Sequence, residues 1–132
     1  MISRGRSFNR NDYHIVFCTK KRYPFLTKKV YQKLRKIFKE KEDSLEFKIH
    51  IVNGMTDHIH ILLSLPSKLS VSKVVNHIKG FSSHEIEELY WQKGYSSFTV
   101  DKTSFNKIFN YIKNQKTHHE NSTYESEIKF FS

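Results

Sequence analysis

Two histidines, His58 and His60, lie one residue apart in the segment DHIHILLSL over 57–65, which has the composition of a strand. Side chains alternate along a strand, so both imidazoles project from one face, roughly 7 Å apart along the chain. We expect helices to cover the opposite Ile/Leu face and the histidines to point from the other face, which is left open for a ligand or for the last helix. Such a pair can bind one divalent cation and leave room for a third ligand. Two hydrogen-bonded surface histidines are the alternative.

Tyr111 and Gln115 form a second candidate pair, because residues four apart lie on the same side of a helix. Their positions fall beside the apolar stripe of that helix, at the border between core and solvent. A glutamine oxygen can be a third hard ligand for a magnesium-type ion, and a phenol beside a held phosphate can act as a nucleophile. A boundary tyrosine that packs its ring and a hydrated glutamine are the alternative.

Apolar periodicity predicts the elements that would position these groups. Strands are expected at 12–19, 45–53, 57–65 and 95–101, with Phe47, Ile49 and Ile51 on one side of the second. Helices are expected from Thr27, as N-cap, to about Lys41 and from about Thr103 to His118. Another long helical segment is expected from Ser70 until Gly94 stops it, with Gly80, Ser82 and Ser83 as positions where it could bend or break. The order β-α-β-β-α-β followed by a helix predicts an α+β, ferredoxin-like antiparallel sheet.

Positive charge is concentrated in the first third of the chain. The protein has 132 residues, 23 Lys and Arg, 13 Asp and Glu and a formal net charge of +10. Residues 1–41 contain 13 Lys and Arg against 2 Asp and Glu, so the whole excess lies there. Such a field attracts a polyanion, nucleic acid before a membrane surface. We expect one domain over 1–132, with a basic arm at 1–11.

Composition excludes several other classes of protein. The one cysteine, Cys18, forms no internal disulfide and builds no cysteine zinc site. No apolar run is long enough for a membrane span, and the N-terminus lacks a signal-peptide pattern. These features predict a cytoplasmic protein without a membrane partner.

Several motifs together resemble a known family. His58-Ile59-His60, the segment Lys79–Ser83, and Tyr111–Gln115 followed by His118-His119 are similar to the single-tyrosine HUH transposases of the smallest bacterial insertion sequences, the IS200-like transposases. The opening Tyr13–Phe17 with Lys20-Lys21-Arg22 also resembles that family. The resemblance runs from about Asp12 to about Glu127.

The resemblance implies a metal-dependent tyrosine transposase. His58, His60 and Gln115 would hold Mg²⁺ or Mn²⁺, and Tyr111 would attack single-stranded DNA to give a 5′-phosphotyrosine and a free 3′-hydroxyl. It also implies hairpins near the element ends and a homodimer whose active sites are shared between chains. Candidate DNA-backbone contacts are Arg4, Arg6, Arg10, Lys20, Lys21, Arg22 and Lys79.

Three other readings remain open at the level of sequence. A domesticated, palindrome-associated tyrosine transposase would use the same residues. A non-catalytic ferredoxin-like nucleic-acid-binding module would place aromatics on the open sheet face. A small-molecule metalloenzyme would need a closed apolar pocket. His14, His50 and Asp57 are weighed as groups that could orient the candidate ligands, with an ordinary structural role preferred for the two histidines.

Overall fold

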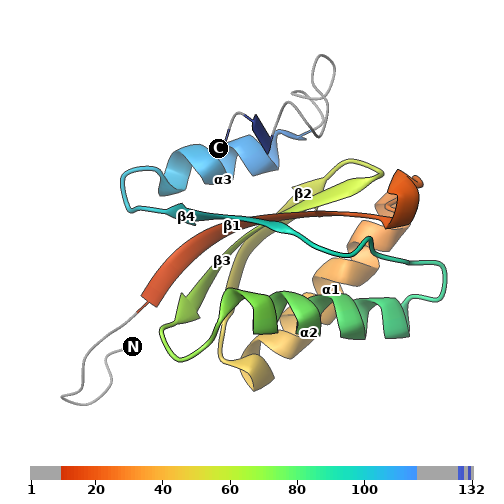
Figure 1. The fold of residues 1–132 in the computed structure, drawn as a ribbon, viewed down its shortest axis with the longest axis horizontal. Helices are drawn as coiled ribbons and strands as arrows, with labels where there is room; N and C mark the ends of the chain where they lie inside the picture. The colour runs from red at the N-terminus through yellow and green to blue at the C-terminus, as the bar shows by residue number, and fades with distance from the viewer. Residues whose placement is uncertain (1–9, 116–127, 130, 132) are drawn as a thin grey trace.

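A four-stranded antiparallel sheet with helices on both faces forms the protein (Figure 1). The computed structural model describes residues 10–115, 128, 129 and 131. The strands are β1 (Arg10–Cys18), β2 (Lys48–Gly54), β3 (His58–Pro66) and β4 (Ser96–Val100), in the spatial order β2-β3-β1-β4. The helices are α1 (Lys28–Leu45), α2 (Val71–Glu85) and α3 (Phe105–Lys113), with a short 3₁₀ turn, η1 (Lys20–Arg22). This confirms the predicted ferredoxin-like order and the added C-terminal helix.

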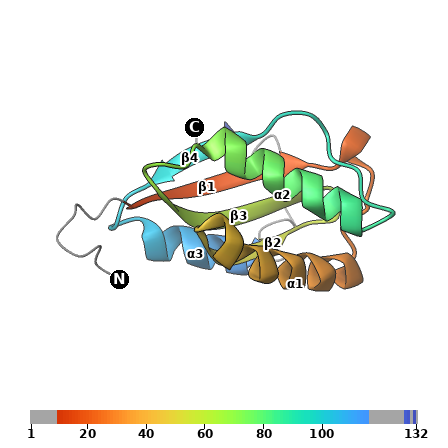
Figure 2. The same cartoon turned by 90° about the horizontal axis from the view of Figure 1, so that it is seen from below.

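The two sheet faces are covered by different helices. Helices α1 and α2 lie side by side on what we call the lower face, and α3 lies on the upper face (Figures 1 and 2). Alternation along β3 places Ile59, Ile61, Leu63 and Leu65 in the main core on the lower face. Leu62 packs instead with Val100 and Ile112 in a smaller cluster on the upper face.

The lower layer begins where the sequence predicted. The Thr27 hydroxyl accepts a hydrogen bond from the Val30 amide at 3.2 Å, so Thr27 is the N-cap of α1. The helix continues to Leu45 rather than ending near Lys41, and Glu46 then closes it in the left-handed conformation.

The expected length of the second long helix is wrong. Helix α2 ends at Glu85 instead of running toward Gly94, because Ile86 takes an extended conformation. Ile86 and Leu89 thereby reach the main core in a non-helical segment, and Trp91 forms a bridge with Thr19. The apolar residues Ile86 and Leu89, which suggested a longer helix, are buried, but they are not helical.

The expectation that Ile49 and Ile51 lie on one side of the second strand is also wrong. In β2 the regular alternation of side chains is interrupted by a β-bulge between these two residues. Ile49 packs against the main core, whereas Ile51 packs against the upper cluster, so the two isoleucines do not share a face. A bulge inserts one residue into the ladder and changes which face the following side chain meets.

No helix among the described residues is long and apolar enough to cross a membrane.

Candidate functional site

The first residues of β3 include the histidine pair, which lies on the upper face. His58 lies opposite Cys18 of β1 and His60 opposite Val16, and the centroids of the two imidazole rings are 5.3 Å apart. The turn before β3 is tight: a Cβ at Gly54 would collide with the His58 carbonyl oxygen. The buried Tyr31 hydroxyl donates to the carbonyls of Met55 and His58, at 2.7 and 3.1 Å, so α1 fixes the start of the strand.

Of the two occupants expected for this face, the structure shows the last helix, and both histidines are buried rather than open to solvent, with exposures of 1% and 0%. Helix α3 covers this face since its apolar stripe packs on Leu62, Val100 and the partly buried Ile51. Phe131 adds a second cover, with its ring 4.6 Å from that of His14 and 4.9 Å from that of Tyr111. The pair is therefore buried beneath the last helix.

Each candidate ligand histidine contacts a second side chain through Nδ1. His58 Nδ1 lies 2.7 Å from Asp57 Oδ1, and His60 Nδ1 lies 2.8 Å from His14 Nε2. A histidine that binds a metal through Nε2 carries its proton on Nδ1 and donates it to such a partner. Asp57 was weighed as an orienting group in the sequence, and its side chain reaches His58 because it precedes the first residue of the strand.

Asp57 also forms an ion pair with Arg22, whose Nη2 lies 3.2 Å from Oδ2 of the carboxylate. Partial burial on its own would raise the pKa of Asp57, but the hydrogen bond with His58 and the Arg22 charge outweigh it and hold the pKa below its usual range. Asp57 is therefore charged near neutral pH and favours a proton on Nδ1 of His58.

Tyr111 and Gln115 come to the same face from the end of α3. The Tyr111 ring centroid is 6.0 Å from that of His60 in the same chain. Gln115 lies just beyond Lys113, the last residue of α3, and its Nε2 is 3.5 Å from the Tyr111 carbonyl oxygen. Gln115 is completely buried, which is deeper than the border position that its spacing indicated.

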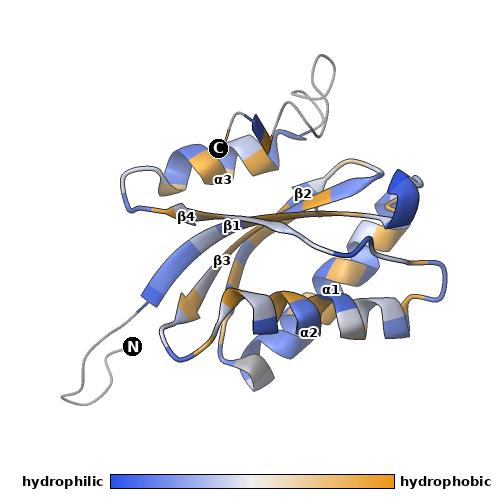
Figure 3. Cartoon of the chain, in the orientation of Figure 1, coloured by the Kyte–Doolittle hydropathy of each residue, from blue (hydrophilic) through white to orange (hydrophobic). Residues whose placement is uncertain are grey.

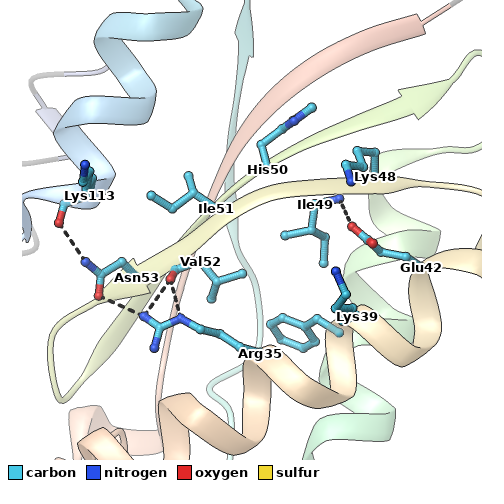
Figure 4. A pocket seen from close by; sticks show the side chains of 11 residues that line it. Arg35, Lys39, Glu42, Lys48, Ile49, His50, Ile51, Val52, Asn53 and Lys113 are labelled. Carbon is cyan, nitrogen blue, oxygen red and sulfur yellow. Dashed lines mark hydrogen bonds between the residues drawn. The ribbon is translucent and has the colours of Figure 1, made fainter.

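Asn53 anchors this end of α3 and was not singled out in the sequence for any such role (Figure 4). Its Nδ2 donates to the carbonyls of Ile112 and Lys113 at 3.0 and 3.2 Å. Arg35 of α1 in turn donates to the Val52 carbonyl at 2.9 Å and lies 3.4 Å from Asn53 Oδ1. Helices on opposite faces of the sheet are thus joined through the end of β2, beside Tyr111.

A polar network occupies the other part of the upper face. Ser64 donates a short hydrogen bond to Asp12 and contacts His50 Nε2 at 2.6 Å, and the His50 ring packs edge-on against Phe105. Burial lowers the pKa of His50, and the nearby Arg10 and Lys48 charges lower it further, against the opposing effect of Asp12. His50 supports α3 here and has no contact with the histidine pair among the interactions described.

Among the predicted DNA-contact residues that the structure describes, not all lie on one surface. Lys20, Lys21 and Lys79 line a common groove, whereas Arg22 is partly buried against Asp57. Arg10 belongs to β1 rather than to a basic arm, pairs with Asp12 at 3.4 Å, and lies roughly 25 Å from the end of the strand that faces His58. Arg4 and Arg6 lie outside the described residues, as do His118 and His119.

Residues 7–115 match the family model described as transposase, IS200 like. The chain is 36% identical over 119 residues to the transposase of insertion sequence element IS200 from Salmonella typhimurium, covering 78% of this chain and 75% of that protein. It is 25% identical over 127 residues to the ISDra2 transposase TnpA of Deinococcus radiodurans, covering 86% and 91%.

Two solved structures share the fold. A candidate transposase from Deinococcus radiodurans superposes with a TM-score of 0.66 at 23% identity, covering 87% of this chain and 97% of that one. A REP-associated tyrosine transposase bound to a REP hairpin superposes with a TM-score of 0.68 at 18% identity, covering 90% and 74%. The family model spans most of the sequence, and the chain therefore belongs to the IS200-like transposase family.

Proposed function

We propose that this transposase cleaves and rejoins single-stranded DNA through a covalent bond to Tyr111, with a divalent cation at His58, His60 and Gln115. The observation that carries the proposal is the approach of Tyr111 to the buried His60, with ring centroids 6.0 Å apart. These side chains come from a strand and a helix separated by about fifty residues of sequence. Only the packing of α3 on the upper face brings them together.

The donor set suits Mg²⁺ or Mn²⁺. Both histidines have Nδ1 engaged, by Asp57 and by His14, so Nε2 of each ring would be the atom that binds the cation. Among residues 10–115, 128, 129 and 131, no three His, Cys, Asp or Glu side chains are grouped to hold a metal. The third protein ligand that we propose is the amide oxygen of Gln115, a hard donor that these ions accept.

When bound, the cation supplies Lewis-acid stabilisation of charge on the scissile phosphate. Tyr111 performs the covalent step: its phenol loses a proton and its oxygen forms a bond to phosphorus. The bond from phosphorus to the 3′-oxygen breaks, and that oxygen leaves as a hydroxyl with a proton. A 3′-hydroxyl later attacks the phosphotyrosine and releases Tyr111, so rejoining needs no nucleotide cofactor.

DNA with a hairpin is the partner we propose. The similar REP-associated protein is bound to a hairpin, and a net charge of +10 favours binding of a polyanion. The proposal includes a homodimer with shared active sites, in which α3, packed here on the sheet of its own chain, would instead carry Tyr111 to the histidine pair of the partner chain. A domesticated transposase acting on genomic palindromes would use the same site, and the sequences that flank the gene distinguish the two.

A non-catalytic nucleic-acid module is not favoured. Such a module stacks bases on aromatic side chains of an open sheet face. Here α3 covers the face, and the residues beneath it include three buried histidines, His14, His58 and His60.

The decisive experiment compares the wild-type protein with Tyr111→Phe on single-stranded DNA from the gene's own flanks, with Mg²⁺ or Mn²⁺. The wild type is expected to form a covalent protein–DNA species on a denaturing gel, whereas the variant binds DNA without forming it. An adduct formed by Tyr111→Phe would assign the nucleophile to another residue. Undiminished cleavage in excess chelator would remove the cation from the proposal.

Mixing two inactive variants tests whether sites are shared between chains. A mixed dimer of Tyr111→Phe with His60→Ala contains one intact histidine pair and one intact tyrosine on different chains. If sites are shared, this mixture recovers adduct formation. If each chain uses its own tyrosine, the mixture stays inactive and the shared-site arrangement is wrong.

A further inference from the structure

A broad groove of about 800 Å³ lies where η1, α2 and the segment after α2 meet. Its charged lining residues are Lys20, Lys21, Lys79 and Lys93, and its aromatic lining residues are Tyr90 and Trp91. No acidic side chain is among the described residues that line it. We call it the lysine groove. Figure 3 shows η1 as a strongly hydrophilic turn at the end of the apolar sheet.

One exposed aromatic ring, that of Tyr90, lines this groove, and other exposed rings lie close to the lining residues in sequence. Among the described residues, the exposed large hydrophobic side chains are Tyr23, Tyr90 and Tyr95, which are 52%, 56% and 38% exposed, and each adjoins η1 or the segment after α2. Ring centroids of Tyr23 and Phe25 are 5.8 Å apart, and those of Phe25 and Tyr90 are 6.0 Å apart. Exposed rings beside lysines are the combination on which unpaired bases stack.

The groove is held by hydrogen bonds and does not need to form on binding. The Lys20 amide donates to the Tyr90 carbonyl at 2.9 Å, and the Gln92 amide donates to the Cys18 carbonyl at 2.9 Å. Lys79 Nζ donates to the carbonyls of Gln92 and Gly94, at 2.9 and 2.5 Å, which fixes its charge at the floor. A prepared site loses less conformational entropy when a ligand binds.

The backbone of η1 is strained in a way that serves this groove. Lys21 and Arg22 both have positive φ, 53° and 58°, which is uncommon for residues other than glycine. The turn is closed by hydrogen bonds from the Arg22 amide to the Thr19 carbonyl and from the Thr19 hydroxyl to the Tyr23 carbonyl, at 3.0 and 2.6 Å. It leaves Lys20 and Lys21 exposed while Arg22 turns back to Asp57.

The same turn connects the groove to the histidine pair. Thr19 follows Cys18, which lies opposite His58, and the Thr19 amide donates to the Asp57 carbonyl at 3.0 Å. The backbone that carries the groove is thus bonded directly to the residues at the start of β3.

We propose that the lysine groove binds the unpaired DNA strand on one side of the scissile phosphate. Lys20, Lys21 and Lys93 contact its phosphates, and Tyr90, with Tyr23, stacks on its bases. This inference rests on the proposed single-strand chemistry, because it assigns the path of the substrate outside the histidine site.

Binding is measured in the Tyr111→Phe protein, so that cleavage does not intervene. The probe is a labelled oligothymidine longer than the roughly 16 nucleotides that a single-strand-binding fold covers, titrated by fluorescence anisotropy at several salt concentrations. Adding Tyr90→Ala should weaken binding about tenfold with an unchanged salt slope, because it removes stacking and no charge. Tyr90→Phe should restore wild-type affinity.

Removing a lysine charge should instead change the salt dependence of DNA binding. Lys20→Ala and Lys21→Ala should each lower the slope of log K against log salt by about 0.7. Lys73→Ala is the matched control, since Lys73 is exposed on α2 but lines a different hollow. Unchanged affinity in Tyr90→Ala, or an equal loss on a hairpin without unpaired bases, would overturn the proposal. Adduct formation by the protein with intact Tyr111 is scored separately, so failure of the chemistry is distinguished from failure of the groove.

Discussion

Neighbouring residues of β3 lie in two different chemical environments. On the lower face, Ile59, Ile61, Leu63 and Leu65 pack against two long helices in the main core. On the upper face, His58, His60 and Ser64 are equally buried, but each has a polar partner beneath one short helix. The pleat of one strand thus separates the part of the protein that stabilises the fold from the part that would do the chemistry.

The difference shows how a small domain can bury polar groups. Unpaired polar atoms in the interior are costly, whereas hydrogen-bonded ones are tolerated. Main-core apolar contacts on the lower face supply the stability that permits the polar upper face. We expect substitutions on the two faces to separate stability from activity.

The largest expected effects come from two adjacent substitutions on opposite faces. His60→Ala removes a candidate cation ligand, so adduct formation should fall by more than the roughly 100-fold that loss of an outer partner costs. Ile61→Ala creates a core cavity and should lower the free energy of unfolding by about 2–5 kcal/mol. Adduct assays at a temperature where both variants are folded, with urea unfolding, measure the two effects.

If the lower face provides stability and the upper face provides activity, His60→Ala and Ile61→Ala should have different effects. Folded Ile61→Ala should retain adduct formation per molecule, and His60→Ala should lose less stability than Ile61→Ala. The reverse pattern would mean that the faces do not have separate roles.

A smaller effect is expected from His14, whose Nε2 contacts His60 Nδ1. His14→Leu should weaken Mn²⁺ binding in the absence of DNA by about 10- to 100-fold, because the orienting acceptor is lost. His14→Gln places an amide oxygen near the position of Nε2 and should restore most of the affinity. Calorimetric titration with Mn²⁺ measures both. Equal losses in the two variants would indicate a packing role rather than orientation.

Asn53 gives a prediction confined to α3. Asn53→Ala removes two hydrogen bonds to the last carbonyls of the helix, and should destabilise this end by about 1–3 kcal/mol. Amide hydrogen exchange of residues 108–115 should accelerate, while exchange in β3 should not. Asn114→Ala is the control, since its side chain bonds only within the helix, to the Asn110 carbonyl at 2.9 Å. Faster exchange throughout the sheet would contradict this local role.

The smallest expected effect is the pH dependence contributed by His50. Burial lowers its pKa in the folded state, so below about pH 6.5 the unfolded chain takes up more protons than the folded one. Stability is therefore lost as pH falls from 6.5 toward the lowered pKa. Urea unfolding of the wild type and His50→Gln on both sides of this pH should show a smaller acid loss in the variant. Equal losses would show that other groups are responsible.

Part of the architecture follows from local patterns in the sequence. Apolar alternation in 57–65 and helical spacing in 27–41 and 103–118 predict the order of elements and the fold class, which the structure confirms. The same alternation correctly assigns His58 and His60 to the face opposite the main core. These are properties of a few consecutive residues, and backbone geometry converts them directly into faces.

Other features depend on the register between strands and on how helices pack. The contact of His14 with His60 arises because β1 places His14 opposite Leu62, diagonal to His60. Three other features also depend on contacts with distant parts of the chain. They are the bulge at His50, the end of α2 at Glu85 and the burial of the histidine pair under α3. Local periodicity sets which way a side chain points, but only the assembled tertiary structure decides what it meets, because those partners come from other elements whose alignment is fixed by the packing of the whole chain.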